Sequence, residues 1–380
     1  NSLGEHRASL AEGDKALTAL TKVANPDLQQ KAHIQILKAD SLRALTRLPE
    51  AKQQLAEVER SVWLKNALPS EALAHYWHVV GQVAYSEYRW QDVKRSEAKA
   101  LEILEATPSP SPQLREQARY ALAYSYLALR DLPTAEKQFI ALKQSSEKRY
   151  GKVHFLHCQA IQGHAEILTI QFKLKEAIAE AQSATDCVQQ AVGENTMAYA
   201  KALTRVANAH FSSADWEVAA GIYLRAAQIA TKANGAIVSQ ALVYRNNAAR
   251  AYKSAGQPEK AHPLLIAVLA DARTTLPEDH AIVQSIKFHL AGTLLDMKKT
   301  EGVEKLLAGL KVATLNSIRP DKLWDAYLKY QHGRLAFYTG DKKVARQLLE
   351  EAARELNKDS RATIAQERQL ANQLLAEASR

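Results

Sequence analysis

A repeat of 42 residues is the feature that most constrains this chain. Stepping by 42 from Ala123 in both directions meets only Ala or Gly, at Ala39, Gly81, Ala123, Ala165, Ala207, Ala249, Ala291 and Gly333. A second column, twelve residues later, holds only Ala or Val, at Ala51, Val93, Ala135, Ala177, Ala219, Ala261, Val303 and Ala345. A third column, four residues further on, is apolar except at Glu97, and comprises Leu55, Glu97, Phe139, Ala181, Tyr223, Leu265, Leu307 and Leu349. Helices approach closely only where side chains are short, and a large residue one turn later fills the adjoining space. The period therefore predicts eight antiparallel helix pairs.

Turn-forming residues recur with the same register. Gly256-Gln257-Pro258 and Gly340-Asp341 stand where the first helix of a pair must end. Between pairs the loop signals are Thr107–Pro112, Gly151, Gly193–Asn195, Asn234-Gly235, Pro277–His280 and Arg319-Pro320. The register continues through the Pro-Ser stretch, so we interpret that stretch as an inter-repeat loop rather than a domain linker.

The ends of the chain depart from the repeat. We expect residues 1–31 to form a leading helix or cap, residues 32–357 to form the eight repeats, and residues 358–380 to form a closing helix. The end units of a solenoid must cover an apolar face that would otherwise be exposed.

Composition agrees with an all-α chain and narrows the function. Gly (14) and Pro (11) are scarce among 380 residues, which favours helix. No apolar run of about 18 residues occurs, so no membrane span is predicted. The net charge is +9, but Lys and Arg are interspersed with Asp and Glu. That pattern is typical of a solvated helical surface, and nucleic-acid binding is disfavoured. Because the first residue is Asn, we expect a processed chain or a fragment.

Motifs for chemistry are absent from the sequence. There is no H-E-x-x-H, G-x-S-x-G, G-x-G-x-x-G or P-loop. We therefore expect no enzyme activity, no cofactor and no metal. Cys158 and Cys187 fall at helix ends that antiparallel packing brings together. Two interpretations stay open: a disulfide, which would indicate an oxidising compartment, or two buried thiols.

Several segments resemble tetratricopeptide repeats. Within Tyr120–Leu142, the residues Ala123, Tyr126, Ala135 and Phe139 have the spacing of that motif. The stretch from Asn246-Asn247-Ala248-Ala249 through Leu264-Leu265 to Leu276–His280 resembles the 42-residue type found in kinesin light chains and bacterial signalling proteins. Two departures are that the last loop lacks the usual Gly and that Ala281 replaces Pro. The resemblance implies a right-handed superhelical solenoid with terminal capping helices, in which the first helix of each pair lines a concave groove.

On this resemblance, polar residues of the first helices become candidate ligand contacts. They are His78, Gln82, Tyr120, Tyr124, Gln162, Lys201, Arg205, Asn208, Asn246, Asn247, Arg250, Lys253, His289, Tyr330 and Arg334. Asn and Gln both donate and accept, so they can hold a peptide backbone, and Tyr offers flat contact area. The cations of repeats five and six favour an acidic or carboxylate-bearing ligand. The alternative is that these residues are simply solvated.

The sequence thus predicts a protein- or peptide-binding scaffold or regulatory module within a larger signalling or transcription-regulating protein. A sensor domain for a small effector, as in bacterial regulators, is the alternative. We expect a cytoplasmic location, with an extracytoplasmic or periplasmic domain of a larger protein as the alternative.

Overall fold

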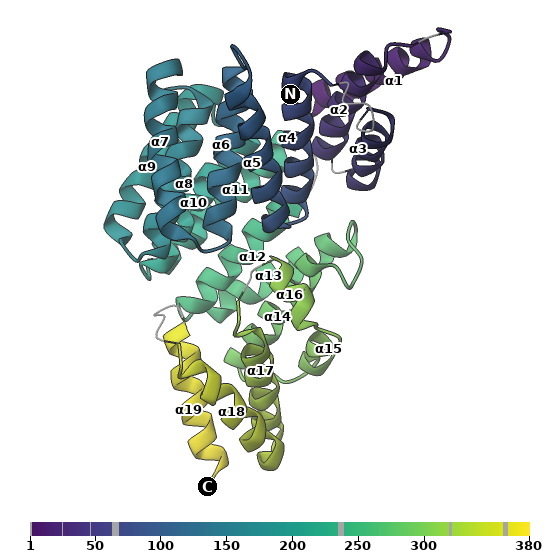
Figure 1. The fold of residues 1–380 in the computed structure, drawn as a ribbon. Coiled ribbons are helices and arrows are strands. Elements are labelled where there is room, and N and C mark those ends of the chain that lie inside the picture. The colour runs from purple at the N-terminus through teal and green to yellow at the C-terminus, as the bar shows by residue number, and fades with distance from the viewer. Residues whose placement is uncertain are drawn as a thin grey trace. The chain divides into compact units, whose positions relative to one another are not determined.

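The structure is a computed structural model that describes residues 2–24, 26–45, 47–62, 68–234, 239–318, 321–359 and 364–380. Over these ranges all regular structure is helical, with nineteen α-helices and no strand (Figure 1). The predicted all-α class is confirmed. No helix in these ranges combines the length and apolarity needed to cross a membrane. The predicted loop residues Gly235, Arg319 and Pro320 lie outside the described residues.

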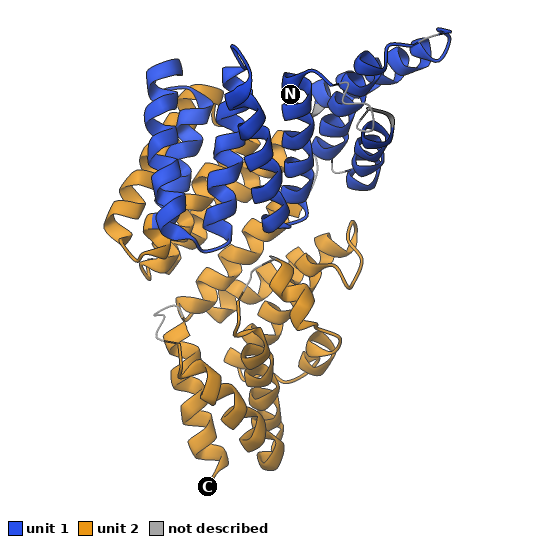
Figure 2. Cartoon of the chain, viewed as in Figure 1, with its two compact units in different colours: residues 1–167 blue, residues 168–380 orange. Residues whose placement is uncertain are grey.

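The helices follow the predicted order of pairs between two end helices. In chain order they are α1 (Ser2–Leu20); α2 (Leu28–Ala44) and α3 (Leu48–Val62); α4 (Ser70–Ser86) and α5 (Trp90–Ala106); α6 (Pro112–Ala128) and α7 (Leu132–Tyr150); α8 (Phe155–Ile170) and α9 (Leu174–Val192); α10 (Met197–Ser212) and α11 (Trp216–Asn234); α12 (Ser239–Ser254) and α13 (Pro258–Arg273); α14 (Ala281–Asp296), α15 (Val303–Leu307) and α16 (Val312–Ile318); α17 (Trp324–Thr339) and α18 (Lys342–Leu356); and α19 (Ala365–Ala378). The chain divides into two compact units, residues 1–167 and 168–380, which we call unit 1 and unit 2 (Figure 2).

The three columns of the repeat are the packing surface of the pairs. Every member of all three columns is buried. The Gly positions show why the first column must be small: a Cβ added at Gly333 would lie 2.9 Å from Cγ of Leu349 on the partner helix. Burial of these apolar positions supplies the main stabilisation of each pair.

From the second pair onward, the turn inside the pair has a left-handed residue that recurs every 42 positions. Its φ lies between +55° and +91° at Tyr88, Arg130, Phe172, Ala214, Gly256, Lys298 and Gly340. Only two of the seven are Gly, so the sequence showed this turn plainly in two pairs. In two of these turns the next residue, Asp131 or Asp341, caps the second helix with its side chain, and Asp341 Oδ1 accepts the backbone N–H of Val344 at 3.0 Å.

The seventh pair departs from the regular plan. Its second part is two short helices, α15 and α16, separated by Gly309 at φ +75°. The buried side chain of Gln284 on α14 stabilises this break, because its Oε1 accepts the backbone N–H of Lys311 at 2.9 Å.

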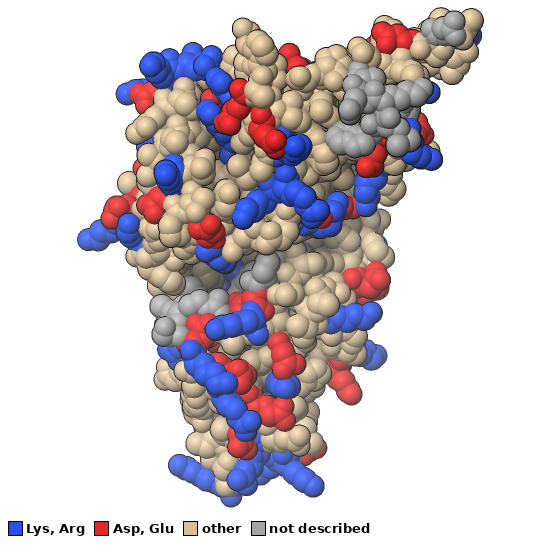
Figure 3. Space-filling view, in the orientation of Figure 1, with Lys and Arg blue, Asp and Glu red and all other residues tan. Residues whose placement is uncertain are grey.

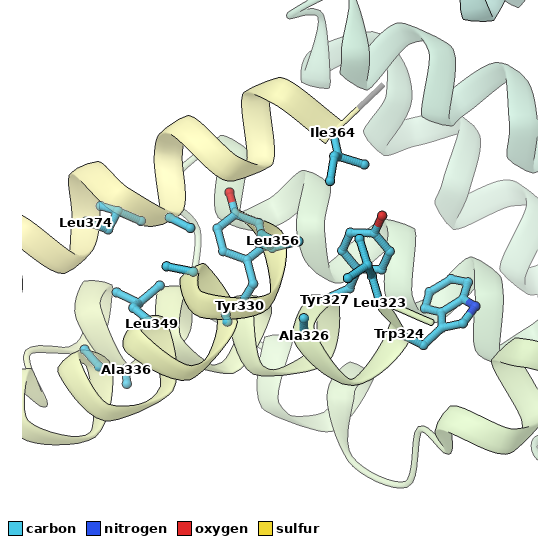
Figure 4. Packing of buried hydrophobic residues seen from close by; sticks show 14 of the residues in the cluster. Leu323, Trp324, Ala326, Tyr327, Tyr330, Ala336, Leu349, Leu356, Ile364 and Leu374 are labelled. Atoms are coloured by element: carbon cyan, nitrogen blue, oxygen red, sulfur yellow. The ribbon is translucent and has the colours of Figure 1, made fainter. Parts of the chain in front are cut away.

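The last helix covers the end of the repeat array. Ala371, Leu374 and Ala378 of α19 are buried in one cluster with residues of α17 and α18, such as Tyr330 and Leu349 (Figure 4). In this cluster α19 closes the apolar face of the last pair, as expected for a capping helix.

Candidate functional site

The first helices of consecutive pairs in unit 2 pack against each other, α12 on α14 and α14 on α17. Arg250 on α12 also lies over the ring of Phe211 on α10. Residues three or four apart on a helix share a face, so we group the polar candidates of α10, α12, α14 and α17 as one series. We call it the unit 2 row; it comprises Lys201, Arg205, Asn208, Asn246, Asn247, Arg250, Lys253, His289, Tyr330 and Arg334.

Asn246 joins two first helices. It is 4% exposed, and its Nδ2 donates to Oγ of Ser285 on α14 at 3.1 Å. Its Oδ1 lies 2.9 Å from Nδ1 of His289, also on α14. The structure therefore places the Asn246 amide between helices, where it holds α12 and α14 together, and not on an open surface. Ser285, which shares this arrangement, was not among the sequence-predicted residues.

A chain of ion pairs continues the row toward its C-terminal end. Nζ of Lys253 lies 3.6 Å from Oδ2 of Asp296, and Oδ1 of Asp296 accepts from Nη2 of Arg334 at 2.7 Å. Nζ of Lys253 also lies 3.8 Å from Oε1 of Glu367 on α19. Arg334 is 1% exposed, and its guanidinium lies 5.3 Å from the ring centroid of the buried Tyr330. Arg334 and Tyr330 thus support the row from inside unit 2.

The accessible part of the row lies on α10 and α12. Lys201 is exposed, and Arg205 and Asn208 are half-buried. On α12, Asn247 and Arg250 are half-buried as well. This leaves two amides and three cations, with the partly exposed Lys253 beside them. The amides can donate hydrogen bonds to a peptide backbone and accept hydrogen bonds from it, and the cations can bind a carboxylate.

Two contacts orient this accessible part. The guanidinium of Arg250 lies 4.2 Å from the ring centroid of Phe211 on α10, a cation–π contact that restricts its position. Oδ1 of Asn208 accepts a hydrogen bond from the hydroxyl of Tyr223 on α11. The side chains are therefore held before any ligand binds, which reduces the entropy lost on binding.

The predicted residues of unit 1 have different surroundings. Nδ1 of His78 lies 2.8 Å from Oε2 of Glu97, and Nε2 of Gln82 donates to Oε1 of Glu97 at 3.1 Å. Glu97 is fully buried, and this burial raises the pKa of its carboxyl. Burial acts to lower the pKa of His78, but the Glu97 carboxylate outweighs it and raises that pKa. His78 and Gln82 thus provide the hydrogen-bond partners of the buried Glu97 carboxylate. The sequence signal for this cluster was that Glu97 is the one charged residue in the third column of the repeat.

Tyr120 and Tyr124 belong to a group of aromatic rings in unit 1. Their ring centroids are 6.2 Å apart, and Tyr124 lies 5.4 Å from Tyr85 and 5.7 Å from Trp90. Gln162 on α8 is half-buried. The unit 1 candidates therefore do not form one polar series like that of unit 2.

Other sequence features have plain outcomes. Cys158 and Cys187 are both buried, but neither is a free thiol, so the interpretation as two thiols is wrong.

The part of the chain that is described contains no group of three or more His, Cys, Asp or Glu that could hold a metal ion. Lys and Arg side chains are interspersed with Asp and Glu over the face seen in Figure 3.

Comparisons with known proteins identify the class of fold. Residues 242–282, which include the Asn246-Asn247 pair, match the tetratricopeptide repeat family model. A Rap protein complexed with competence and sporulation factor is 16% identical, with 99% of this chain and 96% of that chain covered and a TM-score of 0.61. The apo form of the quorum sensor NprR from B. thuringiensis is 13% identical, with 100% and 97% covered and a TM-score of 0.61. NprR in complex with its cognate peptide NprX is 13% identical, with 100% and 98% covered and a TM-score of 0.56.

The chain is thus a helical-repeat protein with a tetratricopeptide-like fold. The match to the tetratricopeptide repeat family model confirms the predicted resemblance. No curated protein matches the sequence.

Proposed function

We propose that this chain is a peptide-binding regulatory module and that the accessible part of the unit 2 row holds a peptide that carries a carboxylate. The observation that carries the proposal is the set of amides and cations on α10 and α12, in which Arg250 and Asn208 are held by neighbouring side chains. Two proteins of similar fold have been solved in complex with a factor or a peptide, which supports this class of ligand.

The residues of the row divide between contact and support. Asn247 would hold the peptide backbone with its amide, and Arg250 would bind a side-chain or terminal carboxylate with its guanidinium. Asn246 and His289 would keep α12 and α14 in register beneath the ligand. The lack of catalytic motifs agrees with binding rather than catalysis. We further propose that the module belongs to a larger cytoplasmic signalling or transcription-regulating protein.

The test is selection of peptides from a displayed random library, followed by calorimetry on the selected sequences. We expect acidic sequences to be enriched and Arg250→Ala to weaken binding at least about tenfold, which corresponds to about 1.4 kcal/mol. Asn247→Ala should also weaken binding. The matched control is Lys175→Ala, which removes an exposed cation from α9, a second helix of the same unit. A library that yields no peptide above background, or affinities that neither row variant changes, would contradict the proposal.

A further inference from the structure

Unit 1 contains a hollow that the proposed function does not use. Its volume is about 450 Å³, which is within the range of small-molecule sites. It lies at the N-terminal ends of three successive first helices, α2, α4 and α6. The lining residues are His33, Pro69, Glu71, Ala72, His75, Ser111, Gln113, Leu114 and Gln117.

Four polar side chains of this hollow have no partner among the described residues, whereas Ser111 already accepts the backbone N–H of Leu114. Among the described residues, the side chains of His33, His75, Gln113 and Gln117 make no hydrogen bond or ion pair. An uncharged imidazole has one donor and one acceptor, and a Gln amide offers both. Four groups able both to donate and to accept therefore converge on one space from three helices.

The charge of the lining restricts what can enter. Among the lining residues that the structure describes there is no Lys or Arg, and Glu71 places a carboxylate there. Burial, together with the neighbouring His78, lowers the pKa of His75 to about 4, so this ring is uncharged at neutral pH. A phosphate or carboxylate would meet no Lys or Arg among the described lining residues and would face Glu71, which disfavours it. The side chains of Asp27 and Ser111 already cap the N-termini of α2 and α6, which reduces the attraction of these helix ends for an anion. Pro69, Ala72 and Leu114 supply apolar contact.

We propose that this hollow binds an uncharged, hydroxyl-rich small molecule of the sugar or polyol class. Each hydroxyl of such a ligand donates and accepts, which matches the paired capacity of the imidazole and amide groups. The C–H faces of the ligand would lie on Pro69, Ala72 and Leu114. The lining of the hollow shares no residue with the unit 2 row, and this assignment does not rest on the proposed function.

The experiment is saturation-transfer NMR and calorimetry on the full chain with glucose, maltose and myo-inositol, each compared with glucose 6-phosphate and ATP. We expect at least one uncharged compound to bind, and the phosphorylated compounds to bind at least about tenfold more weakly, because their charge has no partner. Gln117→Leu and His75→Phe should abolish binding. Gln113→Ala, at an exposed position where folding is not at risk, should weaken it. Asn247→Ala in unit 2 is the control and should leave it unchanged.

Two results would overturn the assignment. One is the absence of binding by every uncharged compound, and the other is equal or stronger binding of glucose 6-phosphate or ATP. Sugar binding that survives all three variants of the hollow would also place the ligand elsewhere. Circular dichroism and thermal unfolding of each variant separate loss of binding from loss of fold.

Discussion

Oδ1 of Asn246 lies 2.9 Å from Nδ1 of His289, and this contact links the first helices of two consecutive pairs. The next residue, Asn247, is half-buried and makes no side-chain hydrogen bond within the described residues. Two adjacent asparagines of one helix therefore have different surroundings, and the difference can be measured.

Replacing each asparagine by Ala should distinguish the structural role of Asn246 from the ligand-contacting role of Asn247. We expect Asn246→Ala to lower the free energy of unfolding by about 1–3 kcal/mol, because it leaves buried partners unsatisfied. Asn247→Ala should change it by less than about 0.5 kcal/mol, as is usual for accessible positions. Urea unfolding followed by circular dichroism measures both. Equal losses of unfolding free energy in the two variants would contradict a specific stabilising role for the buried Asn246 amide.

The buried pair of Glu97 and His78 should be sensitive to removal of one partner. Glu97→Ala leaves His78 and Gln82 without their acceptor, and we expect a loss of about 3 kcal/mol in the free energy of unfolding. Adding His78→Phe to that variant should recover part of the loss, because the unpaired imidazole is removed. A double variant that loses the sum of the two single effects would contradict a direct interaction.

The left-handed residue of the turn inside a pair can be tested by two opposite substitutions, Ala to Gly in one turn and Gly to Ala in another. Ala214 has φ +65° and Gly256 has φ +72°, and both are exposed. A side chain in this conformation costs about 1–2 kcal/mol, so Ala214→Gly should raise thermal stability and Gly256→Ala should lower it. A Cβ at Gly256 would meet nothing within 4 Å, so a steric clash would not account for the loss. Differential scanning calorimetry measures both, and the same sign in both would refute the explanation.

The pH dependence of stability should report His75. Its pKa is about 4 in the folded chain, below the ordinary 6.5, so the unfolded chain binds more protons between these pH values. The free energy of unfolding should therefore fall as pH decreases from about 6.5 to about 4, by about 2–3 kcal/mol from this group. The loss would be complete below pH 4. His75→Phe should remove this component, and identical pH profiles for both proteins would contradict it. Urea titrations at each pH give the comparison.

The fold could be predicted because its signal is periodic and local. Residues such as Ala123, Ala135 and Phe139 recur every 42 positions, and close helix packing tolerates only short side chains at the first two. The left-handed conformation of Tyr88 was not predicted, because nothing in the residue type distinguishes it from an ordinary helical residue. The break after Leu307 was not predicted either. The polar residues of unit 2 were placed on the first helices by the same periodicity.

The sequence by itself therefore determined the helices and their pairing, since both follow from the 42-residue spacing. Only the tertiary structure decided which polar groups pair, because partners such as Asn246 and Ser285, or Asp296 and Arg334, lie about 40 residues apart. Their contact depends on how far one helix is shifted along the next and on side-chain rotamers. The hollow beside His75 has the same origin, since three separate helices must meet before its lining exists.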